Sequence, residues 1–173
     1  ISFYIMEMKS KLKNKVNQIF DNSLISARFS HLGYTNSVGF NRKLAIQKIF
    51  DKKKYIKGKL SSWKYIKECS KVMGMLSPFG WGEICYRDFE SILSKSLLVK
   101  PDMSHLDTWP NIYLEDLYFK IDWDFNNIKN LDTFARTENK EIYSMINRSS
   151  IIYLKALDEC SSRAESMLDQ ILK

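Results

Sequence analysis

The stretch "KVMGMLSPFGWGEICYRDFESILSKSLLVKP", residues 71–101, decides the fold that we predict. It begins with an apolar run over residues 71–76 and closes with a second apolar run over residues 97–100. Between them, a turn with Ser77-Pro78 and two glycines leads into an amphipathic segment over residues 83–94. Short buried strands that alternate with helices are typical of a parallel α/β sheet. We therefore predict a strand, a helix and a second strand in this stretch.

The rest of the chain continues the alternation. Residues 23–33 read as a strand and its loop, and further strands are predicted over residues 54–60 and 118–122. Helices are predicted over residues 8–20, 62–70 and 139–173. Two more are predicted behind side-chain caps: one runs from Arg42 to about Lys52 behind Asn41, and the other runs from a cap at Asp124 or Asn126 to about Ala135. The predicted fold class is α/β: a single Rossmann-like domain with a mostly parallel sheet of five or six strands, flanked by helices, and a helical C-terminus. We divide the chain into a basic helix or linker (1–22), the Rossmann-like domain (23–138) and C-terminal helices (139–173).

Composition narrows the class of protein. The 173 residues are 45% hydrophobic, enough for one domain with its own core. The three cysteines and two histidines are too widely spaced for the usual zinc sites or for a disulfide framework, which favours a cytoplasmic setting. No apolar run approaches the ~20 residues of a transmembrane helix. The polar N-terminus does not read as a signal peptide, and because it begins with Ile1 we expect a piece of a longer chain.

Charge is distributed unevenly along the sequence. Residues 1–75 hold 16 Lys+Arg and 4 Asp+Glu, whereas the remainder holds 11 and 16. A basic half of the chain favours an anionic partner. The candidates are nucleic acid, an anionic membrane surface and a phosphorylated ligand, but the charge equally fits a solvated surface. Trp63 and Tyr65 among lysines suit stacking on bases, yet no nucleic-acid-binding motif accompanies them, so nucleic acid is not favoured. Peripheral contact with the inner face of the membrane stays open.

The segment over residues 83–94 places polar side chains on one helix face. Glu83, Arg87 and Glu90 follow at intervals of four and three residues. A helix start has unbonded N–H groups and a partial positive charge, and the glycines let a ligand approach the backbone. An anion such as a diphosphate therefore fits beside residues 80–83, with Arg87 as a forked donor. The same spacing equally fits a surface ion-pair ladder, and the glycines equally fit a simple turn.

The run "SPFGWGEICYRDFESILSKSLLVKPDM" and the later "YFKIDWDFNNI" resemble the C-terminal, donor-binding half of glycosyltransferases of the GT-B fold. The similarity is strongest to exostosin-like, capsule-associated and spore-maturation-type bacterial enzymes. It is carried by the glycine-containing loop, by Arg87-x-x-Glu90, by the apolar strand ending at Lys100-Pro101 and by residues 118–125. Many such enzymes have two acids eight residues apart on this segment. Glu90 matches the second acid, but the position of the first is occupied by Gly82.

This resemblance implies transfer of a sugar from a nucleotide-diphosphate donor to a glycan or lipid-linked acceptor in surface polysaccharide synthesis. It implies that the ribose contacts Glu90 and that the diphosphate contacts Gly80, Trp81, Gly82, Glu83 and Arg87, with Arg42 as a further candidate. The nucleotide sugar is a co-substrate, and no cofactor or metal is expected because a helix start and an arginine can stabilise the diphosphate charge. An N-terminal domain of the same fold is the expected partner and source of the catalytic base, so we assign no catalytic residue. The alternative is a non-catalytic basic α/β module that binds nucleic acid or an anionic membrane surface.

The long loop after residues 97–100 supplies further candidates. Met103, His105 and Trp109 are candidates for contacts to the donor sugar or the acceptor. The alternatives are a locally hydrogen-bonded histidine and packing of the loop itself. Asp122 and Asp124 look like an acid/base pair, but residues of this type near a helix start are more often caps.

Overall fold

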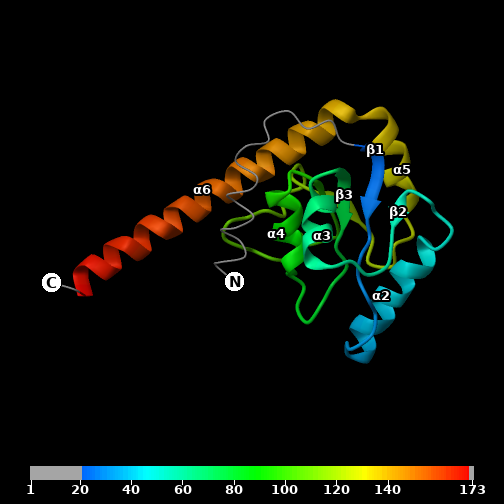
Figure 1. The fold of residues 1–173 in the computed structure, drawn as a ribbon, viewed down its shortest axis with the longest axis horizontal. Helices are drawn as coiled ribbons and strands as arrows, with labels where there is room; N and C mark the ends of the chain where they lie inside the picture. Colours follow the sequence, from blue (N-terminus) through cyan, green and yellow to red (C-terminus); the bar gives the residue numbers. More distant parts are fainter. Residues whose placement is uncertain (1–20, 172–173) are drawn as a thin grey trace.

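The computed structural model describes residues 21–171, with side chains from residue 24 to residue 164. Within this range the strands form one five-stranded sheet in the order β2-β1-β3-β4-β5, and every neighbouring pair is parallel. This confirms the predicted α/β fold with a Rossmann-like parallel sheet. The strands are β1 (Asp21–Ser26), β2 (Tyr55–Ile56), β3 (Val72–Leu76), β4 (Leu97–Pro101) and β5 (Phe119–Ile121). Figure 1 labels the first three strands, β1, β2 and β3.

Helices cover both faces of the sheet. The helices are α2 (Asn36–Lys48), α3 (Ser62–Cys69), α4 (Tyr86–Leu93), α5 (Ile128–Thr137) and α6 (Asn139–Ile171). Helices α2 and α5 share one hydrophobic cluster with the sheet, whereas α3 and α4 pack on the other face. Because both faces are covered, β3 and β4 are buried along their whole length, which explains their continuous apolar runs.

The helix α6 joins the two faces and then leaves the domain. Its first part packs in the α5 cluster, and Tyr153 further along packs in the α4 cluster. From Asp158 to Ala164 every side chain is exposed, and in Figure 1 this end extends away from the rest of the molecule. None of the helices within residues 21–171 combines the length and the apolar character needed to cross a membrane. The predicted basic helix over residues 8–20 lies outside the described residues.

Three helix starts differ from the prediction; that of α5 follows an Asn127 N-cap rather than a cap at Asp124 or Asn126. The helix α2 begins at Asn36 rather than Arg42, so the turn-forming stretch before Arg42 is helical. It contains no proline, and Gly39 donates its N–H to the carbonyl of Thr35 at 2.7 Å. A glycine suits this position because a Cβ there would lie 3.3 Å from the His31 carbonyl. Asn41 is therefore not a cap, and its side-chain amide instead donates to the carbonyl of Trp123.

The helix α4 begins at Tyr86, three residues later than predicted. The carboxylate of Asp88 accepts the N–H of Cys85 at 2.9 Å, which makes Cys85 the N-cap and Asp88 its capping-box partner. Residues 79–85 consequently form a loop above the carboxyl end of β3. This loop forms one wall of the candidate site.

Candidate functional site

A pocket of about 480 Å³ lies at the carboxyl ends of β1 and β3. Open parallel α/β sheets bind ligands at this edge because the strands deliver successive loops there. The walls come from the loop after β1, from α2, from α3, from the loop after β3 and from the first two turns of α4. Among the lining residues are Tyr34, Arg42, Tyr65, Gly80, Trp81, Gly82, Cys85, Arg87 and Glu90.

Arg42 ties the two pocket loops together. Its buried guanidinium donates from Nε to the Ser30 carbonyl at 2.5 Å and from Nη1 to the Phe79 carbonyl at 2.7 Å. It also lies 4.3 Å from the ring centre of Tyr34. Burial lowers the pKa of Arg42, an effect that the positive charge of Arg87 reinforces. Arg42 thus lines the pocket, as expected of a diphosphate-binding residue, but its hydrogen bonds go to backbone carbonyls.

Arg87 has an unsatisfied donor inside the pocket wall. Its Nη2 donates to the Arg28 carbonyl at 2.5 Å, and the guanidinium carbon lies 5.9 Å from the ring centres of both Phe29 and Tyr65. Its Nη1 is buried and has no hydrogen-bond partner within the described part of the chain. A buried donor without an acceptor destabilises a protein by about 1–3 kcal/mol or more when charged. The Arg87 side chain lines the pocket, so a ligand oxygen that reached Nη1 would remove that penalty.

Glu90 lies on the same wall, as its spacing from Arg87 predicts. Its Oε2 accepts a hydrogen bond from the Tyr65 hydroxyl at 2.7 Å, and both residues line the pocket. Burial raises the pKa of Tyr65, so the phenol keeps its proton and remains the donor. The pocket therefore contains a cation and a carboxylate one helical turn apart.

Glu83 does not join this wall. It lies ahead of α4, and its Oε2 is 2.9 Å from His105 Nε2, with both side chains partly exposed. The ion-pair ladder of Glu83, Arg87 and Glu90 is consequently not formed. His105 also packs edge-on against Trp123, with ring centres 5.6 Å apart.

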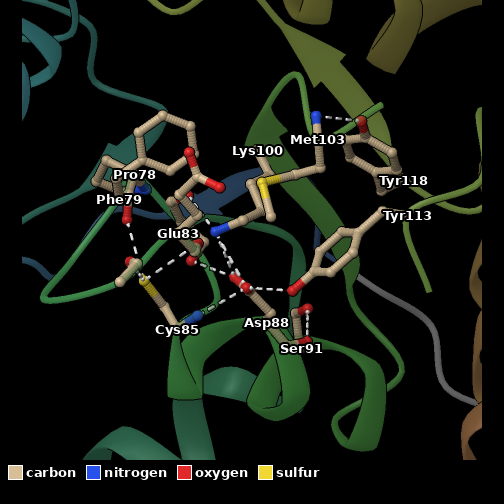
Figure 2. Close-up of polar contacts among 12 residues, drawn as sticks. Pro78, Phe79, Glu83, Cys85, Asp88, Ser91, Lys100, Met103, Tyr113 and Tyr118 are labelled. Carbon is tan, nitrogen blue, oxygen red and sulfur yellow. Dashed lines mark hydrogen bonds and ion pairs between the residues drawn. The ribbon is translucent and has the colours of Figure 1, made fainter. Parts of the chain in front are cut away.

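The remaining sugar or acceptor candidates lie outside the pocket lining. Met103 is fully buried among apolar side chains, and its N–H donates to the Tyr118 hydroxyl at 3.0 Å (Figure 2). Trp109 is 59% exposed and lies under the Arg163 guanidinium. The structure therefore brings neither of them next to Arg87 and Glu90.

The glycine loop places one aromatic side chain at the pocket mouth. Trp81 is 77% exposed, and its ring centre lies 5.5 Å from that of Tyr34. The N–H of Gly80 donates to the Gly82 carbonyl at 3.0 Å, which curls the loop tightly. A Cβ on Gly80 would lie 3.1 Å from the Cys85 sulfur, so this glycine permits the close packing. Burial raises the pKa of the Cys85 thiol.

Sequence reasoning missed the buried centre beneath the pocket. Figure 2 shows the carboxylate of Asp88 surrounded by donors. It accepts from Ser77 Oγ at 2.6 Å and Tyr113 Oη at 2.7 Å, and Lys100 Nζ lies 3.0 Å away. Asp88 and Lys100 are both fully buried. The available signals were an acid at the capping-box position and a lysine closing an otherwise apolar strand.

This buried centre makes the start of α4 less attractive to an anion. The Asp88 carboxylate already occupies the N-terminal end of α4 and accepts the Cys85 N–H. A ligand anion therefore meets a helix start that is already capped by a negative charge. Its main attraction in the pocket is then Arg87 rather than the helix terminus.

Asp122 and Asp124 belong to the turn before α5. Asn127 Nδ2 donates to Asp122 Oδ1 at 3.0 Å, and Asp124 Oδ1 accepts the Asn126 N–H at 3.0 Å. Neither acid is the helix cap that the sequence favoured, because the N-cap of α5 is Asn127; both instead accept hydrogen bonds within the preceding turn. Within the described residues, no three or more His, Cys, Asp or Glu side chains gather where they could hold a metal ion.

No model of a known protein family matches this sequence, and no curated protein matches it. The glycosyltransferase resemblance therefore remains a prediction.

Proposed function

We propose that this chain is the donor-binding half of a glycosyltransferase and binds a nucleotide-diphosphate sugar in the pocket between β1 and β3. The observation that carries the proposal is the buried Nη1 of Arg87, which has no hydrogen-bond partner among the described residues, on a side chain that lines the pocket. A phosphate oxygen is the natural partner, because guanidinium–phosphate hydrogen bonds are among the strongest in proteins. The location at the carboxyl edge of a parallel sheet supports the same ligand class.

The other pocket residues suit the rest of such a ligand. Glu90 lies one helical turn beyond Arg87 and is the proposed acceptor for ribose hydroxyl groups. Trp81 beside Tyr34 offers an exposed aromatic surface on which a nucleobase can stack. In the proposed reaction, Arg87 stabilises the charge that grows on the leaving diphosphate as the sugar moves to a glycan or lipid-linked acceptor. The acceptor-activating base is assigned to no residue of this chain.

The test is calorimetric titration of the protein with UDP, GDP, ADP and CDP and with their sugar conjugates. At least one nucleoside diphosphate should bind, and Arg87→Gln should weaken it by roughly 10- to 100-fold because a charged hydrogen bond is lost. Glu90→Gln should weaken nucleotides more than inorganic pyrophosphate, because only the former carry a ribose.

Arg136→Gln is the matched control, since Arg136 is exposed on α5. It should bind every nucleotide as the unchanged protein does. Equal affinities of the Arg87→Gln variant and the unchanged protein for all nucleotides would show that the pocket is not a donor site.

A further inference from the structure

We propose that the outer face of α3 docks on an anionic lipid bilayer. This α3 face consists of Lys59 in the preceding loop, Trp63, Lys64 and Lys67 on the helix, and Lys71 just beyond it. All five side chains are exposed, and Trp63 is 66% exposed. The inference concerns a different surface from the nucleotide pocket and holds whether or not the pocket binds a nucleotide.

Helical geometry gathers these residues on one side. At 100° per residue, Trp63, Lys64 and Lys67 fall within an arc of about 100°. Tyr65 and Cys69 point the opposite way and pack with the sheet cluster of Val72 and Met75. The helix therefore has one face committed to the core and one basic face turned outward.

The positive charge of the α3 face is not neutralised within the described part of the chain. Lys59, Lys64, Lys67 and Lys71 make no ion pair with any residue described there. Glu68 is the only acid between residues 52 and 71, and it is bound by Arg28 at 2.6 Å. The hydrogen bond from Arg28 to Glu68 also raises the pKa of Arg28. Four lysines thus present their charge to the surroundings.

The chemistry of the face favours lipid headgroups over nucleic acid. Every cation on it is a lysine, whereas nucleic-acid recognition relies strongly on the planar, forked guanidinium of arginine. A tryptophan among lysines is typical of a membrane–water interface, where its apolar ring enters the boundary and its N–H stays hydrated. Non-specific binding of single strands uses successive aromatic platforms, and among the five residues that define the α3 face Trp63 is the single aromatic one.

Docking would also place the pocket near the bilayer. Tyr65, on the inner side of the same helix, lines the pocket. A membrane in contact with the α3 face would therefore lie one helix diameter, about 10 Å, from the pocket wall.

The test is co-sedimentation of the protein with phosphatidylserine–phosphatidylcholine vesicles and with phosphatidylcholine vesicles. Binding should require phosphatidylserine and weaken with added salt, because exposed charges are screened. The Lys59→Glu/Lys64→Glu/Lys67→Glu variant should bind at least ~100-fold more weakly, since each lysine near an anionic surface contributes roughly fivefold. Trp63→Ala should weaken binding at unchanged net charge.

The matched control carries Lys43→Glu, Lys129→Glu and Lys140→Glu, which make the same charge change at exposed positions on α2, α5 and the start of α6. It should bind nearly as the unchanged protein does, and thermal unfolding should show that both triple variants fold. Equal binding to both vesicle types, no binding to either, or equal loss in both triple variants would overturn the proposal. If mixed-sequence RNA displaces the vesicles and the first triple variant loses RNA binding instead, the face is a nucleic-acid interface and the proposal is wrong.

Discussion

At the scale of single residues, Asp88 connects more of this molecule than any residue singled out in the sequence. Its carboxylate joins the end of β3 through Ser77, the start of α4 through Cys85, the end of β4 through Lys100 and the following loop through Tyr113. All of its lone pairs face donors, which is the condition under which a buried charge is tolerated. Two of its partners, Ser77 and Cys85, line the pocket, so Asp88 holds part of the pocket wall in place.

We expect Asp88→Ala to lower the free energy of unfolding by roughly 3–5 kcal/mol, because it leaves the Lys100 ammonium buried without its partner. Urea denaturation followed by circular dichroism measures this change. The double variant Asp88→Ala/Lys100→Met should lose less than the sum of the two single variants, since both remove the same interaction. Asp107→Ala, an exposed acid in the same half of the chain, should stay within about 0.5 kcal/mol of the unchanged protein. A similarly small effect of Asp88→Ala would contradict the role given to this network.

At the scale of elements, Asp132 ties α5 to the edge strand β2. It accepts hydrogen bonds from Lys52 and from the Tyr55 hydroxyl, both at 3.3 Å, and forms an ion pair with Lys54. Since β2 has only two residues, this tie supplements a short ladder of backbone hydrogen bonds. The contact therefore stabilises the edge of the sheet at its weakest strand.

The Asp132 contact should make stability depend on pH in the acid range. Burial acts to raise the pKa of Asp132, but the hydrogen bond and charge of Lys54, with those of Lys52, outweigh it and hold that pKa below its ordinary value. The folded state then binds the proton less readily than the unfolded state, so the contribution is fully present above pH ~4. It is lost as the pH falls through the lowered pKa.

Thermal unfolding at pH values from neutral to strongly acid measures this effect. Asp132→Asn should be less stable than the unchanged protein at neutral pH, and the gap should narrow as the acid range is entered. A constant gap across the whole range would show that the carboxylate charge of Asp132 does not matter. Asp107→Asn serves as the exposed control.

At the scale of the whole molecule, α6 has two parts that differ in burial. Ile142, Met145, Ile146, Tyr153 and Ala156 are buried against the domain. Tyr153 also stacks on Phe89 of α4, with ring centres 5.3 Å apart. Beyond Leu157 the described side chains are exposed. The first part of α6 therefore belongs to the core, and the second adds no apolar burial over residues 158–164.

Two deletions should separate these parts. Removing residues 158–173 should leave the unfolding temperature within about 3 °C, because every side chain described there, over residues 158–164, is exposed. Removing residues 149–173 should lower it by at least ~10 °C or abolish soluble folding, since the buried Tyr153 and Ala156 and the partly buried Leu154 and Leu157 are lost with their apolar contacts. Differential scanning calorimetry measures both. A large loss from the shorter deletion would show that the projecting end stabilises the domain.

Local signals predicted most of the fold. The apolar runs became β3 and β4 near the predicted limits, and α4 follows from its amphipathic pattern even though it starts at Tyr86. The prediction failed at the start of α2, where turn-forming residues became helical because Gly39 allows close packing against the His31 carbonyl. Turn propensity is a weak preference that such packing overrides.

The candidate site likewise has a part that the sequence predicted and a part that it did not. Helical spacing was enough to place Arg87 and Glu90 on one wall, because residues three apart on a helix are neighbours whatever surrounds them. The sequence by itself thus determined the parallel α/β order, the glycine loop and this pair. Only the tertiary structure decided that Arg42 bonds carbonyls, that Met103 is buried and that Asp88 pairs with Lys100. Those contacts join loops and strands distant in the chain, and their energies depend on burial and on partners that exist only once the sheet has formed.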